Sequence, residues 1–211
     1  MKTKLILLIL FGGFLFFSCS KYPPSTVRLT EDLVVYTKYD TSIKFNQFTT
    51  YSIVDSIGYI SQSNGKKDSG WLPNADAQPI LNQIKQNMNS RGYLLVNKNQ
   101  NPNLGINVVV VKNINVQVYY PGWYWEYPGY YPPWYWGGGS YYYPYYPAYI
   151  TSYASGTLMI DMVDRQNVTP DGKMYIRWNA YIRALLTGDH TMAQIQASID
   201  QAFKQTKAFP Q

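Results

Sequence analysis

Apolar and polar positions alternate with the two-residue period of β-strands in several parts of the chain. Residues 33–39 and 44–54 are rich in β-branched and aromatic side chains, and Asp40-Thr41-Ser42 between them is typical of a turn. Residues 106–120 form a further apolar run, for which we expect one long strand or two strands joined at a bulge near Asn113.

The clearest strand pair lies in the C-terminal half. Residues 156–164 and 173–186 are predicted to form a hairpin that turns through residues 169–172. In its second arm, alternate positions are apolar, and the positions between them hold Tyr175, Arg177, Asn179, Tyr181 and Arg183. We therefore expect this second face to meet water or a polar partner.

Two segments have the spacing of amphipathic helices. Residues 79–90 are the first, with Gly92 expected to cap the C-terminal end. The second follows Asp189 or Thr191, either of which can cap its start, and stops before Phe209-Pro210. The glycine- and proline-containing residues 60–79 are expected to form a loop. The order of these strands and helices along the chain predicts an α+β fold, with an antiparallel sheet of about five or six strands and two helices packed on one face.

Residues 119–153 differ from the rest of the chain and are called the aromatic insertion. They contain 14 Tyr and 4 Trp, and Glu126 is their only charged residue. Prolines and the run Gly137-Gly138-Gly139 interrupt regular structure, so we expect a protruding loop whose rings pack on one another and on the domain.

The rings of the insertion suit three kinds of partner equally well at this stage. Tyr and Trp are favoured in the lipid headgroup layer, on the C–H faces of sugars and in protein interfaces. The candidate binding residues are Trp123, Trp125, Trp134, Trp136, Tyr142 and Tyr145.

The N-terminus has the pattern of a bacterial lipoprotein signal. Lys2 and Lys4 precede the apolar residues 5–17, and Ser18 leads into Cys19, the only cysteine. Thirteen apolar residues reach about 20 Å as a helix, which is too short for a hydrocarbon core of about 30 Å. We expect residues 1–18 to be a signal peptide, lipid-modified Cys19 to begin a tether over 19–31, and 32–211 to form one domain. The expected location is the outer membrane, lipid-anchored and facing the periplasm.

Charge and cysteine content narrow the classes of ligand. The whole chain has a formal net charge of +6, and loss of Lys2 and Lys4 with the signal leaves +4. This charge is mild and scattered, which argues against nucleic acid as a partner. With Cys19 acylated, neither a disulfide nor a cysteine-based metal site is available, and we expect no metal and no cofactor.

Residue types that carry catalysis are sparse. His190 stands beside Asp189 at a helix start, where a capping or surface role is favoured. Asp161 and Asp164 are three apart on a strand and point to opposite faces, so they cannot converge on one substrate atom. We expect Asp161 to pair with Arg177 or a neighbour across the hairpin. The protein is therefore predicted not to be an enzyme. A hydrolase is the remote alternative, and it would need carboxylates or His190 gathered in a cleft.

The C-terminal half resembles a known family. The resemblance rests on residues 156–164 (GTLMIDMVD), 176–180 (IRWNA) and the terminal Phe209-Pro210. Residues 39–40, 91–93 and 101–104 hold compatible motifs. This pattern is similar to the domain-of-unknown-function family numbered forty-one thirty-six, whose members are mostly bacterial envelope lipoproteins. The resemblance spans 35–210, implies an α+β domain in the envelope, and transfers no catalytic residue.

We therefore expect a non-enzymatic, membrane-anchored envelope lipoprotein with a structural or binding role. Its aromatic insertion would contact the membrane interface, a glycan or a partner protein. The alternative is a carbohydrate-binding module of the cell envelope.

Overall fold

The computed structural model describes residues 34–63, 66–112, 122–145, 156–183 and 190–210. Its long helices are α2 (Asn74–Ser90) and α3 (Met192–Gln205). Its strands are β1 (Val35–Tyr39), β2 (Thr50–Ile53), β3 (Gly58–Ser63), β4 (Lys66–Trp71), β5 (Leu94–Leu95), β6 (Leu104–Lys112), β7 (Ser140–Tyr142), β8 (Thr157–Val168) and β9 (Lys173–Ile182).

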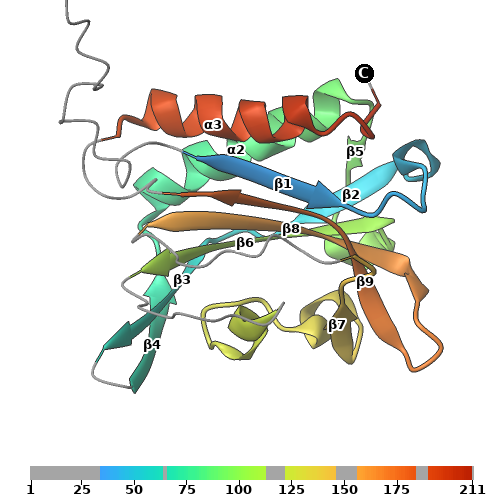
Figure 1. Ribbon diagram of the computed structural model, residues 1–211, viewed down its shortest axis with the longest axis horizontal. Helices are drawn as coiled ribbons and strands as arrows, with labels where there is room; N and C mark the ends of the chain where they lie inside the picture. The colour runs from blue at the N-terminus through green and yellow to red at the C-terminus, as the bar shows by residue number, and fades with distance from the viewer. Residues whose placement is uncertain (1–33, 64–65, 113–121, 146–155, 184–189, 211) are drawn as a thin grey trace, which may run out of the picture.

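Within these ranges the strands form one nine-stranded sheet with the order β1-β9-β8-β6-β2-β5. The β3–β4 hairpin joins it through β3 and β6, and β7 joins it through β9. Helices α2 and α3 lie together over one face, and the described part of the aromatic insertion lies below the other (Figure 1). The α+β class predicted from the sequence is confirmed.

The sheet differs from the expected one in size and in strand direction. It is mixed, because β6 pairs in parallel with β2 and β3 and antiparallel with β8. The predicted loop at residues 60–79 instead holds most of β3, all of β4 and the start of α2. The β3–β4 hairpin is polar and lacks the alternation that marks a half-buried strand, so only its pairing with β6 reveals it. Pro79 lies inside α2, where it removes one backbone hydrogen bond of the helix.

The helix-covered face holds an apolar core. The Trp178 ring of β9 packs on Phe203 and Phe209, at centroid distances of 5.1 and 5.4 Å. Its Nε1–H donates to the Thr206 hydroxyl at 2.8 Å. The expected caps are present: Gly92 has φ 85° at the end of α2, and Thr191 forms a capping box at the start of α3.

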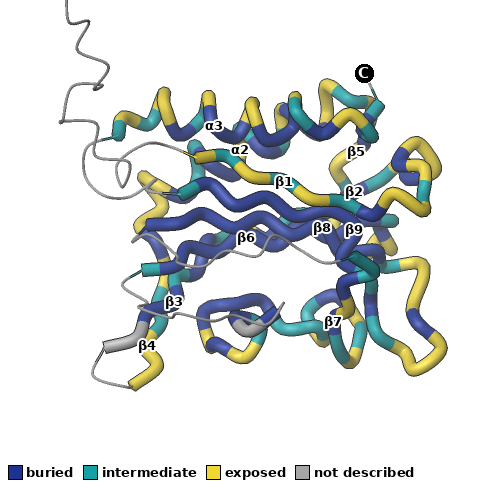
Figure 2. The backbone as a smooth tube through the Cα atoms, in the orientation of Figure 1, coloured by how far each residue is buried: buried dark blue, intermediate teal, exposed yellow. Residues whose placement is uncertain are grey.

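The opposite face of the sheet is also covered. In β6 every residue except Lys112 is buried, and the first eight residues of β8 are buried as well (Figure 2). Such strands need cover on both sides. The described insertion, residues 122–145, supplies it with two short 3₁₀ helices, η3 (Trp123–Glu126) and η4 (Pro133–Trp136), and with β7. The expected protruding loop is thus corrected for these residues, which form a third layer.

Glycines let this layer lie directly on the sheet. A Cβ on Gly58 of β3 would stand 1.9 Å from the Gly129 carbonyl oxygen, so the two backbones touch. A Cβ on Gly105 of β6 would stand 2.7 Å from the Trp136 ring. Side chains at these points would push the layer off the sheet.

This close approach predicts the effect of adding one methyl group. We expect Gly58→Ala to lower the free energy of unfolding by about 1–3 kcal/mol, because the Gly129 backbone has to move away. Gly139→Ala is the matched control, since nothing lies within 4 Å of its Cβ position, and it should change stability by under about 0.5 kcal/mol. Urea denaturation followed by fluorescence measures both. Equal stabilities would show that the insertion does not rest on β3.

Candidate binding site

A buried carboxylate joins the insertion to the sheet. Asp161 of β8 is 2% exposed and accepts hydrogen bonds from three tyrosine hydroxyls of the insertion. Tyr130 and Tyr124 donate to Oδ2 at 2.8 and 2.9 Å, and Tyr143 donates to Oδ1 at 3.1 Å. The hydroxyls of Tyr124 and Tyr143 also contact each other. Three donors from one segment therefore enclose a single acceptor of the sheet.

Asn107 of β6 lies directly across the ladder from Asp161 and extends this polar contact. Its Nδ2 donates to the hydroxyls of Tyr130 and Tyr141 at 2.9 and 3.1 Å. Its Oδ1 accepts from Trp136 Nε1 at 2.7 Å. Every polar atom of this buried amide is hydrogen-bonded, as a stable interior requires.

Burial controls the protonation of these groups. It raises the pKa of Asp161 to about 6, although hydrogen bonds from Tyr130, Tyr124 and Tyr143 act in the opposite direction. Burial also raises the pKa of Tyr124 and Tyr130 far above the ordinary value, so both remain protonated donors.

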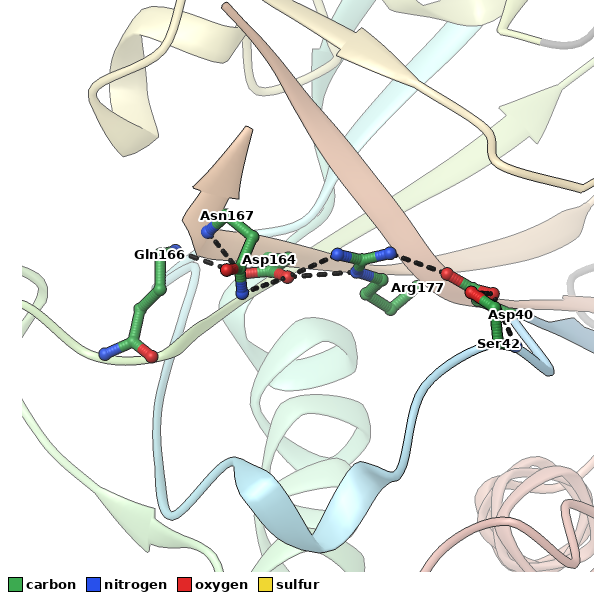
Figure 3. A network of polar contacts seen from close by, with 6 residues as sticks. All are labelled: Asp40, Ser42, Asp164, Gln166, Asn167 and Arg177. Carbon is green, nitrogen blue, oxygen red and sulfur yellow. Dashed lines mark hydrogen bonds and ion pairs between the residues drawn. The ribbon is translucent and has the colours of Figure 1, made fainter. Parts of the chain in front are cut away.

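Arg177 does not pair with Asp161, which corrects the pairing expected from the sequence. Its guanidinium lies between Asp164 and Asp40, with Nε 2.9 Å from Asp164 Oδ2 and one terminal nitrogen 2.6 Å from Asp40 Oδ2 (Figure 3). The reason is a bulge in β9, because Met162 pairs with Trp178 whereas Val163 pairs with Ile176. The extra residue, Arg177, is re-aimed away from the insertion.

The remaining oxygens of this buried network are occupied too. Asp164 Oδ1 accepts from the backbone N–H groups of Gln166 and Asn167 at 3.0 and 2.9 Å. Burial raises the pKa of Asp40, but hydrogen bonds from Ser42 and the Arg177 guanidinium outweigh it and hold that pKa below its ordinary value. The network ties the end of β1 to β8 and β9 and serves as a structural clamp.

The insertion and the β3–β4 hairpin enclose an open hollow of about 420 Å³, called here the aromatic cleft. Most of its lining is aromatic, and the rings are those of Trp71, Trp125, Tyr127, Tyr130, Tyr131, Trp134 and Tyr135. Trp71 and Trp134 stand at its rim with 57% and 74% of their surface exposed. A concave, ring-lined and partly open surface of this kind suits a ligand with flat apolar faces.

Rings from different segments form a row along the cleft. Trp71 of β4 packs edge-on against Tyr131 with centroids 5.7 Å apart, and Tyr131 packs against Tyr135 at 4.7 Å. The Tyr131 hydroxyl contacts Asp55 Oδ1 at 3.2 Å. Burial raises the pKa of Tyr131 to about 12, which keeps this hydroxyl protonated.

Comparison with known proteins identifies the family of the domain. The model of the family described as Domain of unknown function (DUF4136) matches residues 35–210. The chain belongs to the DUF4136 family. This confirms the family resemblance noted in the sequence.

The solved structure of another family member agrees with this membership. The crystal structure of a DUF4136 family protein from Bacteroides thetaiotaomicron has 30% sequence identity and a TM-score of 0.72, over 84% of this chain and 97% of that one. A PDZ domain protein from Parabacteroides distasonis has 13% identity and a TM-score of 0.43, over 85% of this chain and 38% of that one. No curated protein matches this DUF4136 chain.

The predicted binding residues occupy different places in the DUF4136 domain. Trp125 and Trp134 line the cleft. Trp136 and Tyr145 bond to the sheet, the first through Asn107 and the second by donating to Asn179 Oδ1 at 3.1 Å. Tyr142 is half-exposed and packs against Tyr175 outside the cleft. The Trp123 side chain and Cys19 lie outside the described parts of the structure.

Sequence reasoning did not identify Trp71, Tyr131 and Tyr135 as a set. Trp71 falls in residues 60–79, for which the sequence predicts a loop, and no sequence feature separates the two tyrosines from the other rings of the insertion. The available signal was Asn107, a polar residue inside the apolar run of β6 that needed buried partners. That signal points to the covered face and does not by itself locate the cleft.

Chemical groups expected for catalysis are dispersed in the structure. His190 precedes α3, whereas Asp161 bonds to Tyr130 of the insertion and Asp164 binds Arg177. Among the residues with described positions, no group of three or more His, Cys, Asp or Glu side chains is arranged to hold a metal ion. In the same residues, no helix is both long and apolar enough to cross a bilayer.

The raised pKa of Asp161 predicts a pH dependence of stability. Between its ordinary value of 3.8 and about 6, the folded protein keeps a proton that the unfolded chain has released. The stabilisation from this proton is complete below about pH 4 and is lost as the pH rises through about 6. We expect the wild type to lose about 1–3 kcal/mol of unfolding free energy relative to Asp161→Asn between about pH 4 and 7.

Urea denaturation of both proteins across this pH range is the measurement. The Asn side chain keeps the size and one acceptor oxygen of Asp161 but does not titrate, so it isolates the effect of the proton. A stability difference that is constant with pH would mean that the carboxyl group titrates alike in the folded and unfolded states.

Proposed function

We propose that this protein is a non-enzymatic, lipid-anchored protein of the cell envelope that binds glycan in the aromatic cleft. The acylated Cys19 would hold it on the periplasmic face of the outer membrane, and the tether over residues 19–31 would give the domain reach. The glycan-binding part rests on one observation, which is the row of Trp71, Tyr131 and Tyr135 along an open cleft.

The form of the cleft favours a sugar over the other partners considered for the insertion. Pyranose rings present flat C–H faces that stack on aromatic rings, and their hydroxyls need nearby polar groups. The cleft offers both, because Glu126 lines it and the hydroxyl of Tyr131, the middle ring of the row, bonds to Asp55 beside it. A membrane belt would instead require rings that project outward, whereas Tyr124, Tyr130 and Trp136 are buried in the third layer.

The polar groups of the interior support a binding role without catalysis. Asp161 is enclosed by tyrosine hydroxyls, and Asp164 is neutralised by Arg177, so neither carboxylate lines the cleft. A glycoside hydrolase needs two carboxyl groups that face one glycosidic bond. The cleft contains Glu126 as the acidic residue of its lining, with Lys67 3.8 Å from it.

Glycan binding is tested by removing the rings at the rim of the cleft. Trp71→Ala and Trp134→Ala should each weaken binding of envelope polysaccharide by about tenfold or more, because each deletes an exposed stacking surface. Tyr142→Ala is the matched control, since this ring is also half-exposed but lies outside the cleft. Quenching of Trp fluorescence during titration, with calorimetry for the Trp variants, gives the affinities. Equal affinity in all three variants would exclude the cleft as the glycan site.

The lipid anchor is tested separately. Cys19→Ala removes the acylated side chain, so the variant should appear as a soluble or unprocessed species. Cell fractionation and mass spectrometry of the N-terminus measure this, with the wild type as control. Recovery of the variant in the membrane fraction at normal mature size would refute acylation at Cys19.

A further inference from the structure

A second hollow of about 520 Å³ borders the aromatic cleft and is called here the polar groove. The end of β2, α2, β5 and the 3₁₀ helix η2 (Lys98–Gln100) form its walls. Tyr135 lines both the groove and the cleft. The two hollows therefore share a wall at Tyr135.

A lysine side chain lies over the ring of Tyr135. Lys98 Nζ lies 3.9 Å from the centroid of the Tyr135 ring, so the row that begins at Trp71 and passes through Tyr131 ends at an ammonium group. An ammonium over a ring face keeps its charge and its N–H donors. Lys98 can therefore stack on Tyr135 and still bind an anion in the groove.

The charge of the groove favours an anionic ligand. Lys85 and Lys98 both line it and are half-buried, and within the described structure neither forms an ion pair. Lys85 Nζ reaches its neighbour Asn82 only at 3.5 Å. The one acidic lining residue is Asp55, whose Oδ1 accepts hydrogen bonds from Ser56 and Tyr131. Two cations thus face the groove with a single carboxylate that is already hydrogen-bonded.

We propose that the cleft and the groove form one site for an acidic oligosaccharide. Neutral faces of the sugar rings stack on the exposed rings along the row from Trp71 to Tyr135, and carboxylate groups of the next sugar units lie beside Lys98 and Lys85. This inference rests on the proposed glycan binding and adds the ligand's charge and its direction along the site. The amide side chains of η2, exposed at the groove, supply further hydrogen-bond donors to such a ligand.

The experiment compares two probes with the same sugar backbone, hexagalacturonate and its fully methyl-esterified form, in which each carboxylate is replaced by a neutral methyl ester. Both are titrated by calorimetry into the purified mature protein in detergent micelles. We expect the acidic probe to bind about tenfold more tightly than the ester at low salt and to lose this advantage as salt is added. The double variant Lys85→Gln/Lys98→Gln should bind the acidic probe about tenfold more weakly and the ester unchanged.

A matched control is Lys38→Gln/Lys204→Gln, which removes the same charge from β1 and α3, away from the groove, and should bind both probes like the wild type. If both probes bind equally and the groove variant changes nothing, the anionic site is refuted while glycan binding stands. If neither probe binds, the proposed glycan function fails for this class of sugar, and the anionic site fails with it. A loss of affinity for the ester in the groove variant would show that the lysines act on the fold of the cleft and not on charge.

Discussion

The carboxylate of Asp161 is the constraint on which the third layer depends. A carboxyl group in the middle of a sheet is costly to bury unless hydrogen bonds replace its water. Its neighbours on β6 and β9 bond to the insertion instead, since Asn107 Nδ2 donates to Tyr130 and Tyr141 and Asn179 Oδ1 accepts from Tyr145. The three phenol groups that enclose Asp161 come from the insertion, so the segment with the least regular sequence completes the core.

The two faces of the sheet are packed in different ways. On the helix side, Trp178, Phe203 and Phe209 pack on one another, and the ion network of Asp40, Arg177 and Asp164 closes one end. On the insertion side, hydroxyl and amide groups are distributed through the aromatic packing. The aromatic cleft lies where this third layer meets the β3–β4 hairpin, and each contributes part of the ring row.

Much of the fold can be predicted from the local pattern of apolar and polar residues, but the aromatic cleft cannot. The β8–β9 hairpin, β1, α3 and the capping of α2 by Gly92 were predictable because periodicity and caps act over a few residues. The β3–β4 hairpin was not predicted because most of its residues are polar, and it joins the sheet only through the pairing of β3 with β6. The alternation of side chains along β9 predicts that Arg177 lies on the same face of the sheet as Asp161. The bulge at Arg177 turns its side chain away from that face. The ring row joins residues about 60 apart, which no local signal encodes.

The tyrosine hydroxyls bonded to Asp161 and Asn107 have a consequence for molecular recognition. A phenol fixed at its oxygen has lost its rotational freedom before any ligand arrives, and Tyr has few torsions to lose. Tyr130 is fixed in this way, and Tyr131 is fixed through Ser56 and Asp55. The lining of the cleft is thus preorganised, and the entropic cost of complex formation falls mainly on the flexible linkages of the incoming chain.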